Sequence, residues 1–176
     1  GPVCTLYLAD LGADVIKVED TGAGDYARNL GSQSGKVSAF FRAVNRNKRS
    51  IALDLKDPRG RSAFLRLAQD ADAIVESFRP GVVTTLGIDY AAVVPVNPRI
   101  VHVATSAYGQ TGPRALRAGH DINSLGYAGV LDQVGTRDGP PALSNLQIAD
   151  LLGGAAPAAI GLLAGLAGAQ RTGRGR

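Results

Sequence analysis

Residues 49–76 read RSIALDLKDPRGRSAFLRLAQDADAIVE, and this stretch decides the fold class. Residues 49–55 alternate between apolar and polar side chains, which predicts a β-strand. Asp57 followed by Pro58 predicts a helix start, because the carboxylate can cap the first turn and proline is tolerated there. Apolar residues then recur at helical spacing, and residues 72–76 form an apolar stretch typical of a second strand.

The same alternation extends along the rest of the chain. The remaining predicted elements are helices at residues 5–11, 80–86 and from Asp150 onward, and strands at residues 13–19 and 100–105. Apolar, β-branched strands that alternate with helices are typical of a parallel sheet. We therefore expect an α/β fold in which helices cover both faces of such a sheet, and we find no linker that would divide it.

The composition excludes several classes of protein. Apolar residues make up 45% of the 176 residues and charged residues 19%, which is enough for a packed core. Three of the cations behind the net charge of +4 are Arg171, Arg174 and Arg176, and aromatic residues are only 5%. A basic end on a nearly neutral body gives little support to a nucleic-acid partner, so we expect none. The single Cys4 suits a reducing, cytoplasmic location.

Two further interpretations are set aside at this stage. Residues 151–169 carry no charge and are long enough to cross a bilayer, but they are rich in alanine and glycine. We expect a buried helix that other backbones approach closely, and no membrane. The two histidines and one cysteine are dispersed, so we expect no metal site, and His102 is expected to be structural within its strand.

Ligands of parallel sheets collect beyond the carboxyl ends of the strands, where Glu19 and Lys56 are expected. The cations of residues 45–49, Lys56 and Arg79 suit a phosphorylated ligand, although a solvated charged rim gives the same pattern. Glu19 stands where a ribose-binding acid would follow a strand. The Gly-x-Gly-x-x-Gly pattern of dinucleotide sites is missing, however, so that alternative is weak.

His120 and Asp150 are the candidates for proton chemistry. His120 lies in the run Gly119-His120-Asp121-Ile122-Asn123, and Asp150 opens the long apolar helix. An imidazole and a carboxylate can each hold a proton, which is what moving a hydrogen on and off carbon requires. The alternative for both residues is a capping role at a helix start, where a side chain accepts backbone N–H groups.

These segments together resemble CoA-transferase family III, the CaiB/BaiF type, and within it the racemases. The resemblance is carried, in order along the chain, by LADLGADVIKVE (8–19), NKRSIALDLK (47–56), FRPGV (78–82), YGQTGP (108–113), the His120 run, and Ala149-Asp150 with its helix. It implies a Rossmann-like large domain, of which residues 1–176 form the N-terminal part, with the small domain absent from this chain. It also implies a homodimer of interlocked subunits.

The resemblance further implies an acyl-CoA thioester as substrate and no cofactor beyond its coenzyme A. The residues expected along the thioester are Leu53, Asp54, Leu55, Lys56, Arg79, Gly119, Asp121, Ile122, Asn123 and Ser124. His120 and Asp150 are then the catalytic residues. Backbone N–H groups of Asp121 and of the Asp150 helix are expected to stabilise an enolate oxygen.

Two reactions within this family fit the residues. In the racemases a two-base pair transfers the α-proton of a 2-methylacyl-CoA through an enolate, and His120 matches that pattern. In the transferases the aspartate corresponding to Asp150 is a covalent nucleophile that moves CoA between carboxylic acids. Asp20 and Ser124 depart from the racemase pattern, whereas residues 138–141 and 147–150 are common among transferases. We favour the racemase and keep the transferase, and a non-catalytic nucleotide-binding module, as alternatives.

Overall fold

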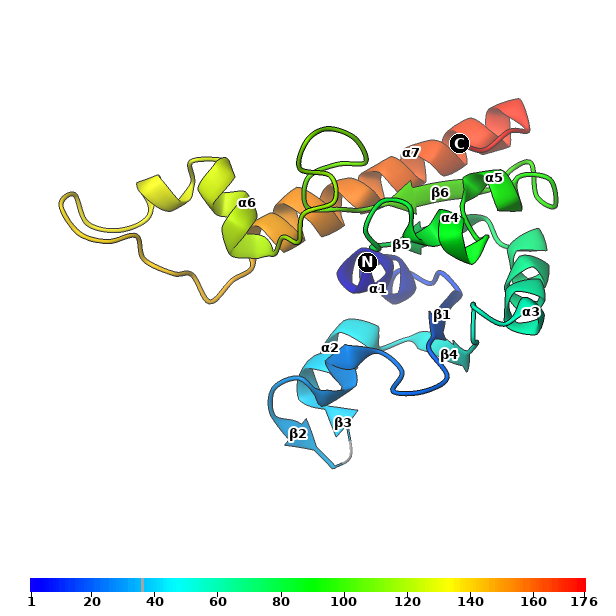
Figure 1. Cartoon of the computed structure of the whole chain (residues 1–176), viewed down its shortest axis with the longest axis horizontal. Helices are drawn as coiled ribbons and strands as arrows, with labels where there is room; N and C mark the ends of the chain where they lie inside the picture. The colour runs from blue at the N-terminus through cyan, green and yellow to red at the C-terminus, as the bar shows by residue number, and fades with distance from the viewer. Residues whose placement is uncertain (36) are drawn as a thin grey trace.

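The computed structural model describes residues 1–35 and 37–176, arranged as in Figure 1. The strands are β1 (Val15–Glu19), β2 (Gln33–Ser34), β3 (Val37–Ser38), β4 (Lys48–Ala52), β5 (Ala73–Glu76) and β6 (Val101–Ala104). The α-helices are α1 (Pro2–Asp10), α2 (Ala39–Asn45), α3 (Pro58–Gln69), α4 (Val82–Leu86), α5 (Tyr90–Val93), α6 (Asp121–Tyr127) and α7 (Ala156–Thr172). Shorter turns are the 3-10 helices η1 (Tyr26–Asn29) and η2 (Leu131–Gln133), and the π-helix η3 (Ala149–Ala155) directly precedes α7.

All four predicted strands are present, and they pair in parallel. β1 pairs with β4, with Val15 opposite Lys48, and β5 pairs with β6, with Ala73 opposite Val101. Within the described residues, however, these are two separate two-stranded sheets, and β2 and β3 form a small antiparallel pair. An alternating apolar pattern predicts that a segment is a strand, but it carries no information on which strand lies beside it. The α/β class with parallel strands is confirmed, whereas the one continuous sheet that we expected is divided.

Strand β4 is shorter than predicted: it ends at Ala52, Leu53 still donates its N–H to the carbonyl of Glu19 at 2.9 Å, and the chain turns at residues 55–56. The Asp54 side chain accepts the backbone N–H of Lys56 at 2.9 Å, which closes a tight turn where we expected strand. The predicted helix start follows: Asp57 caps α3 by accepting the N–H of Arg59 at 2.8 Å. The alternation of side chains continues through this turn, so the pattern overestimated the length of the strand.

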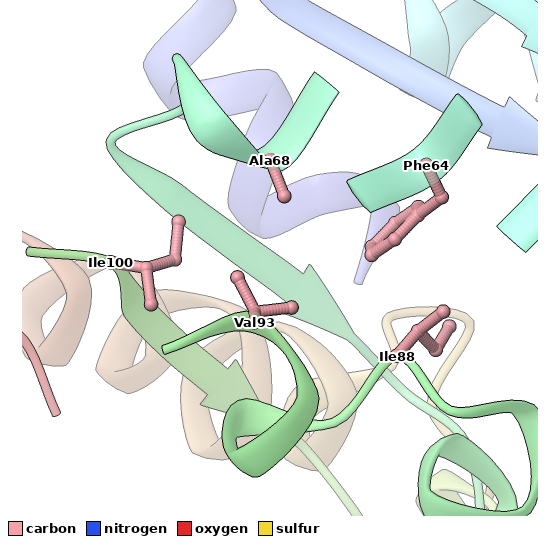
Figure 2. Close-up of a cluster of buried hydrophobic side chains, with 5 residues drawn as sticks. All are labelled: Phe64, Ala68, Ile88, Val93 and Ile100. Atoms are coloured by element: carbon pink, nitrogen blue, oxygen red, sulfur yellow. The ribbon is translucent and has the colours of Figure 1, made fainter. Parts of the chain in front are cut away.

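One face of the β5–β6 sheet is covered by α3, α5 and the segments beside them. The buried residues of this cluster are Phe64, Ala68, Ile88, Val93 and Ile100, which point toward one another in Figure 2. Ile74 of β5 packs against them from the sheet. This apolar layer ties the end of the β4–α3 segment to β5–β6, because Leu53 and Leu55 also contact it.

The opposite face of the same sheet is covered by α1 and by the η3–α7 helix. Cys4, Ala155, Ala158 and Ala159 are buried there and pack against β5 and β6 through Val75 and Val103. Ile74 and Val75 are adjacent in β5 and point to opposite faces, as neighbouring strand residues do. Helices therefore cover both faces of this sheet, as the sequence predicted.

The η3–α7 helix lies close against strand β6. A Cβ atom added at Gly165 would lie 2.7 Å from Cγ1 of Val101, so a side chain at position 165 would collide with the Val101 side chain. The helix spans Ala149–Thr172 and is long and apolar enough to cross a membrane by length and composition. Its buried glycines and alanines lie against the sheet, as expected of a closely approached helix, and Leu152 and Ile160 on its other side are exposed.

A buried ion-pair cluster closes the carboxyl end of β1 around Glu19. Both carboxylate oxygens of Glu19 accept hydrogen bonds of 2.7 Å from Arg28, and Ser50 and the N–H of Asp25 donate at 2.6 and 3.0 Å. The Arg28 guanidinium also stacks on Phe41, 4.1 Å from the ring centroid. All acceptor positions of Glu19 are thus engaged within the chain, which argues against the ribose-binding role considered above.

The Glu19 cluster makes stability depend on pH. The hydrogen bonds from Arg28 lower the pKa of Glu19 from 4.5 to about 2, a difference worth about 3 kcal/mol. Because the folded-state pKa is depressed, this stabilisation is fully present above pH 4.5 and is lost as pH falls toward 2. Arg28 is about a third exposed, and solvent screening reduces the expected effect to about 2 kcal/mol.

We therefore predict that Glu19→Gln lowers the free energy of unfolding by about 2 kcal/mol at pH 7, measured by urea denaturation. The variant should also lose the acid-dependent fall in stability between pH 4.5 and 2. Asp138→Asn, at an exposed turn, serves as the control and should match the wild type. Equal unfolding midpoints of Glu19→Gln and wild type at pH 7 would contradict this assignment.

Candidate active site

A cavity of about 330 Å³ lies where α6 meets the start of η3, and it contains both predicted catalytic residues. In Figure 1, α6 and the segment after it extend away from the parallel sheets, beside the first turns of the long helix. The lining residues form a polar end and an apolar wall: His120, Asp121, Gln147, Ser144 and Asp150 on one side, and Ile122, Leu125, Val130, Leu131, Val134, Ala142, Leu143 and Ile148 on the other. The volume is in the range of small-ligand sites.

His120 occupies the N-cap position of α6. Its backbone N–H donates to Oδ1 of Asn123 at 3.0 Å, so the reciprocal half of a capping box orders this turn. The imidazole is exposed at the cavity. The capping interpretation therefore accounts for the backbone of His120, and its side chain still reaches the cavity.

Asp150 is the second residue of the π-helix η3, whose N-cap is Ile148. The alternative that Asp150 caps the long helix is therefore wrong: an N-cap at Asp150 would make Leu151 the first helical residue, whereas the helix begins at Ala149, two residues earlier. The backbone N–H of Asp150 donates to Oδ1 of Asp121 at 2.9 Å, which links η3 directly to α6. A π-helix is rare and frequently marks a functional site, because it re-aims the side chains of one turn.

Burial and a neighbouring carboxylate together raise the pKa of Asp150 above its ordinary value. Partial burial of the Asp150 carboxyl is the largest cause, and the neighbouring carboxylate of Asp121 raises the pKa further. His120 acts in the opposite direction. A carboxyl group whose pKa lies above its ordinary value is better able to carry a proton at neutral pH, which is the property a general acid needs.

A close contact upstream of His120 determines where α6 begins. A Cβ atom added at Gly119 would lie 2.6 Å from Cβ of Ala107 and 2.9 Å from Cε2 of Tyr108. Tyr108 in turn packs edge-to-face on Tyr127 of α6, with ring centroids 5.7 Å apart, and Arg114 lies 4.1 Å over the Tyr127 ring. Only glycine at position 119 therefore allows the backbone to lie this close to Ala107 and Tyr108 without displacing them.

The predicted thioester-contacting residues fall into two groups. Asp121 and Ile122 line the cavity, and Gly119, Asn123 and Ser124 belong to the same segment. The second group, which follows β4 and β5, lies outside the cavity lining: Leu53, Asp54, Leu55, Lys56 and Arg79. Of these, Leu53 and Leu55 pack into the core, while Lys56 and Arg79 are exposed.

The cations of residues 45–49 do not form the phosphate site considered above. Arg46 precedes β4, and Lys48 and Arg49 are the first two residues of β4, so all three lie at the amino end of that strand. Arg46 pairs with Asp10, Arg49 pairs with Asp14, and the partly buried Lys48 donates to the carbonyl of Pro2 at 2.7 Å. Burial lowers the pKa of Lys48 to about 8. The positive charges of this segment suggested a phosphorylated ligand. In the structure these side chains instead bind carboxylates and backbone carbonyls of the same chain.

Apart from Ile122, sequence reasoning missed the apolar wall of the cavity, which comes mainly from α6, η2 and residues 142–148. Its residues are widely spaced and follow no helical or strand period, so the pattern offered no signal beyond their apolar character. The aromatic contact of Tyr108 with Tyr127 was also missed, because nothing local relates two tyrosines 19 positions apart.

Comparison with known proteins agrees with this arrangement. The sequence profile described as CoA-transferase family III matches residues 1–176. The chain belongs to CoA-transferase family III. It is 40% identical to the acetyl-CoA:oxalate CoA-transferase of Acetobacter aceti, covering 99% of this chain and 45% of that protein. It is 37% identical to human alpha-methylacyl-CoA racemase, covering 100% of this chain and 42% of that one.

The solved structures include a CAIB/BAIF family protein from Brucella suis, which matches with a TM-score of 0.93 at 36% identity. That match covers 99% of this chain and 47% of the other. The chain thus spans less than half the length of these relatives, and it shares their fold over nearly all of its own length. Because the relatives include both CoA-transferases and a racemase, family membership identifies acyl-CoA enzymes as a group and leaves the reaction open.

The contact at Gly119 leads to a prediction for this family III member. In the full-length protein, Gly119→Ala should lower turnover of the acyl-CoA substrate proposed below by roughly 10²-fold, because the added methyl displaces the start of α6 and with it His120. Gly161→Ala is the control, since a Cβ atom there meets nothing within 4 Å. Steady-state kinetics and the unfolding temperature are measured together. Wild-type turnover in Gly119→Ala would show that the close contact does not position the site.

Proposed function

We propose that the full-length protein is a racemase of 2-methylacyl-CoA thioesters, acting through His120 and Asp150. The observation that supports this most is that an imidazole and a carboxyl group from segments 30 residues apart line one cavity. A nucleophilic carboxylate has no chemical need of an imidazole there, whereas transfer of a proton between two faces of a carbon needs two proton carriers.

The proposed reaction balances its protons between these two groups. The neutral imidazole of His120 removes the proton from C2, and the C–H electron pair moves into the C1–C2 bond while the thioester oxygen becomes an enolate. Protonated Asp150 then returns a proton to the opposite face of C2. The pair ends as imidazolium and carboxylate, and the reverse direction uses the same groups in exchanged roles. Neighbouring backbone N–H groups would stabilise the enolate oxygen.

The raised pKa of Asp150 is consistent with the acid half of this cycle. The apolar wall is consistent with a hydrocarbon acyl group beside the reacting carbon, since most of its side chains are aliphatic. Coenzyme A is proposed to enter only as part of the substrate, with no other cofactor, and the full-length protein is proposed to be a homodimer.

A second candidate is a family III CoA transferase in which Asp150 attacks the acyl-CoA carbonyl. The observation in its favour is that several relatives near 40% identity are named as CoA-transferases, including succinyl-CoA:glutarate CoA-transferase of mouse. Asp150 is exposed at the cavity, so its carboxylate is accessible to an acyl carbonyl. Membership in a family of acyl-CoA enzymes leaves the non-catalytic nucleotide-binding module as the weakest of the three alternatives.

Incubation of the full-length protein with a 2-methylacyl-CoA in heavy water distinguishes the two reactions. Racemisation predicts deuterium at C2 without any acceptor acid, and His120→Gln or Asp150→Asn should each slow the exchange by about 10²–10⁴-fold. Asp132→Asn, an exposed carboxylate outside the cavity lining, is the matched control and should exchange at the wild-type rate.

The transferase predicts a different result in the same experiment. No deuterium would enter C2, and acyl groups would accumulate on Asp150 in a form that hydroxylamine releases. That combination would refute the racemase proposal and establish the second candidate in its place.

A further inference from the structure

The side chain of Asp121 lies between the two proposed catalytic residues. Asp121 directly follows His120 in the chain, and its Oδ1 accepts the backbone N–H of Asp150 at 2.9 Å. It is also the first residue of α6, where a carboxylate is favoured by the helix dipole. One carboxylate therefore connects the start of the helix beside His120 to the turn that carries Asp150.

This hydrogen bond joins two segments that are far apart in the chain. α6 and η3 belong to parts of the chain separated by η2 and the long segment after it, and α6 stands away from the parallel sheets in Figure 1. Among the described hydrogen bonds, the Asp121–Asp150 bond is the direct link between α6 and η3. The η3–α7 helix is anchored on β5–β6, so this bond ties α6 to that anchor, together with the contacts of Gly119 and Tyr127 with Ala107 and Tyr108.

We propose that Asp121 is a positioning residue, whose carboxylate holds the Asp150 backbone and thereby sets the separation of the His120 and Asp150 side chains. This rests on the proposed function for the roles of those two side chains, while the bond itself belongs to the fold. Asp121 contributes a negative charge as well as an acceptor, and the two contributions can be separated by substitution.

The charge contribution is directed at Asp150. The titratable side chains that act on the Asp150 carboxyl are Asp121 and His120, both from the start of α6. Asp121 is the anion of the two and raises the pKa of Asp150, so neutralising Asp121 favours the carboxylate form of Asp150. The pKa of Asp150 should therefore fall when Asp121 is neutralised.

Two variants of the full-length protein test the proposal. Asp121→Asn keeps an Oδ1 acceptor but removes the charge, whereas Asp121→Ala removes both. We expect Asp121→Ala to lower kcat by roughly 10²-fold with a smaller effect on KM, because the reacting groups are misplaced. Asp121→Asn should stay within about tenfold of the wild type, and the limb of its pH–kcat profile that reports Asp150 should move to lower pH.

A second readout is independent of any activity. Hydrogen exchange of the Asp150 amide proton should be faster in Asp121→Ala than in Asp121→Asn or the wild type, because only the alanine variant lacks the acceptor. Asp132→Ala is the control, and its kcat, pH profile and amide exchange should match those of the wild type. Circular dichroism and urea unfolding establish that each variant is folded. If Asp121→Ala fails to fold, the pH profile of Asp121→Asn decides.

Two results would overturn the proposal: wild-type kcat and amide exchange in Asp121→Ala, or an unmoved pH profile in a folded Asp121→Asn. Failure of the proposed function is recognised separately, because the wild type would then show no deuterium exchange at C2. In that case the same variants are compared by their rate of hydroxylamine-sensitive acylation at Asp150. The positioning role again predicts a slower rate for Asp121→Ala than for Asp121→Asn.

Discussion

Helix α7 packs closely on strand β6, because its backbone at Gly165 lies against the side chain of Val101. A Cβ atom at Gly165 would approach Cγ1 of Val101 to 2.7 Å, so the separation of the two elements is set by contact between the helix backbone and this side chain. Close-packed contacts of this kind tolerate little displacement. The position of η3, which directly precedes α7, follows from this contact, and so does the place of Asp150.

The other half of the cavity is held differently. α6 is not part of a layer over either parallel sheet, and its position depends on a few specific contacts: the edge-to-face pair of Tyr108 and Tyr127, the close approach at Gly119, and the Asp121–Asp150 hydrogen bond. The site therefore combines the carboxyl group of Asp150, on a helix packed against the sheet, with the imidazole of His120, at the start of a helix positioned by few contacts. Electrostatics couple the two, because Asp121 and His120 act on Asp150 with opposite signs.

Residue types alone were a poor guide to which charged groups serve a ligand. Glu19 and the cations of residues 45–49 both suggested ligand binding. In the structure Glu19 pairs with Arg28, and the cations bind Asp10, Asp14 and backbone carbonyls. Partners for these groups come from segments up to 46 positions away, as with Lys48 and Pro2. No local pattern reveals such a partner, since a charge that is neutralised by the fold and one that is free look alike in sequence.

The amino-acid sequence by itself determined the α/β class, the four strands with their parallel direction, the start of α3 at Asp57, and the residue types of the proton-carrying pair. These follow from local periodicity, from capping chemistry and from the resemblance of ordered motifs. Only the tertiary structure decided that the strands form two separate pairs and that Asp150 lies on a π-helix. It also decided that the carboxylate of Asp121, beside His120, accepts the backbone N–H of Asp150. Those features depend on contacts between residues about 30 positions apart, and such contacts arise from packing rather than from neighbouring residues in the chain.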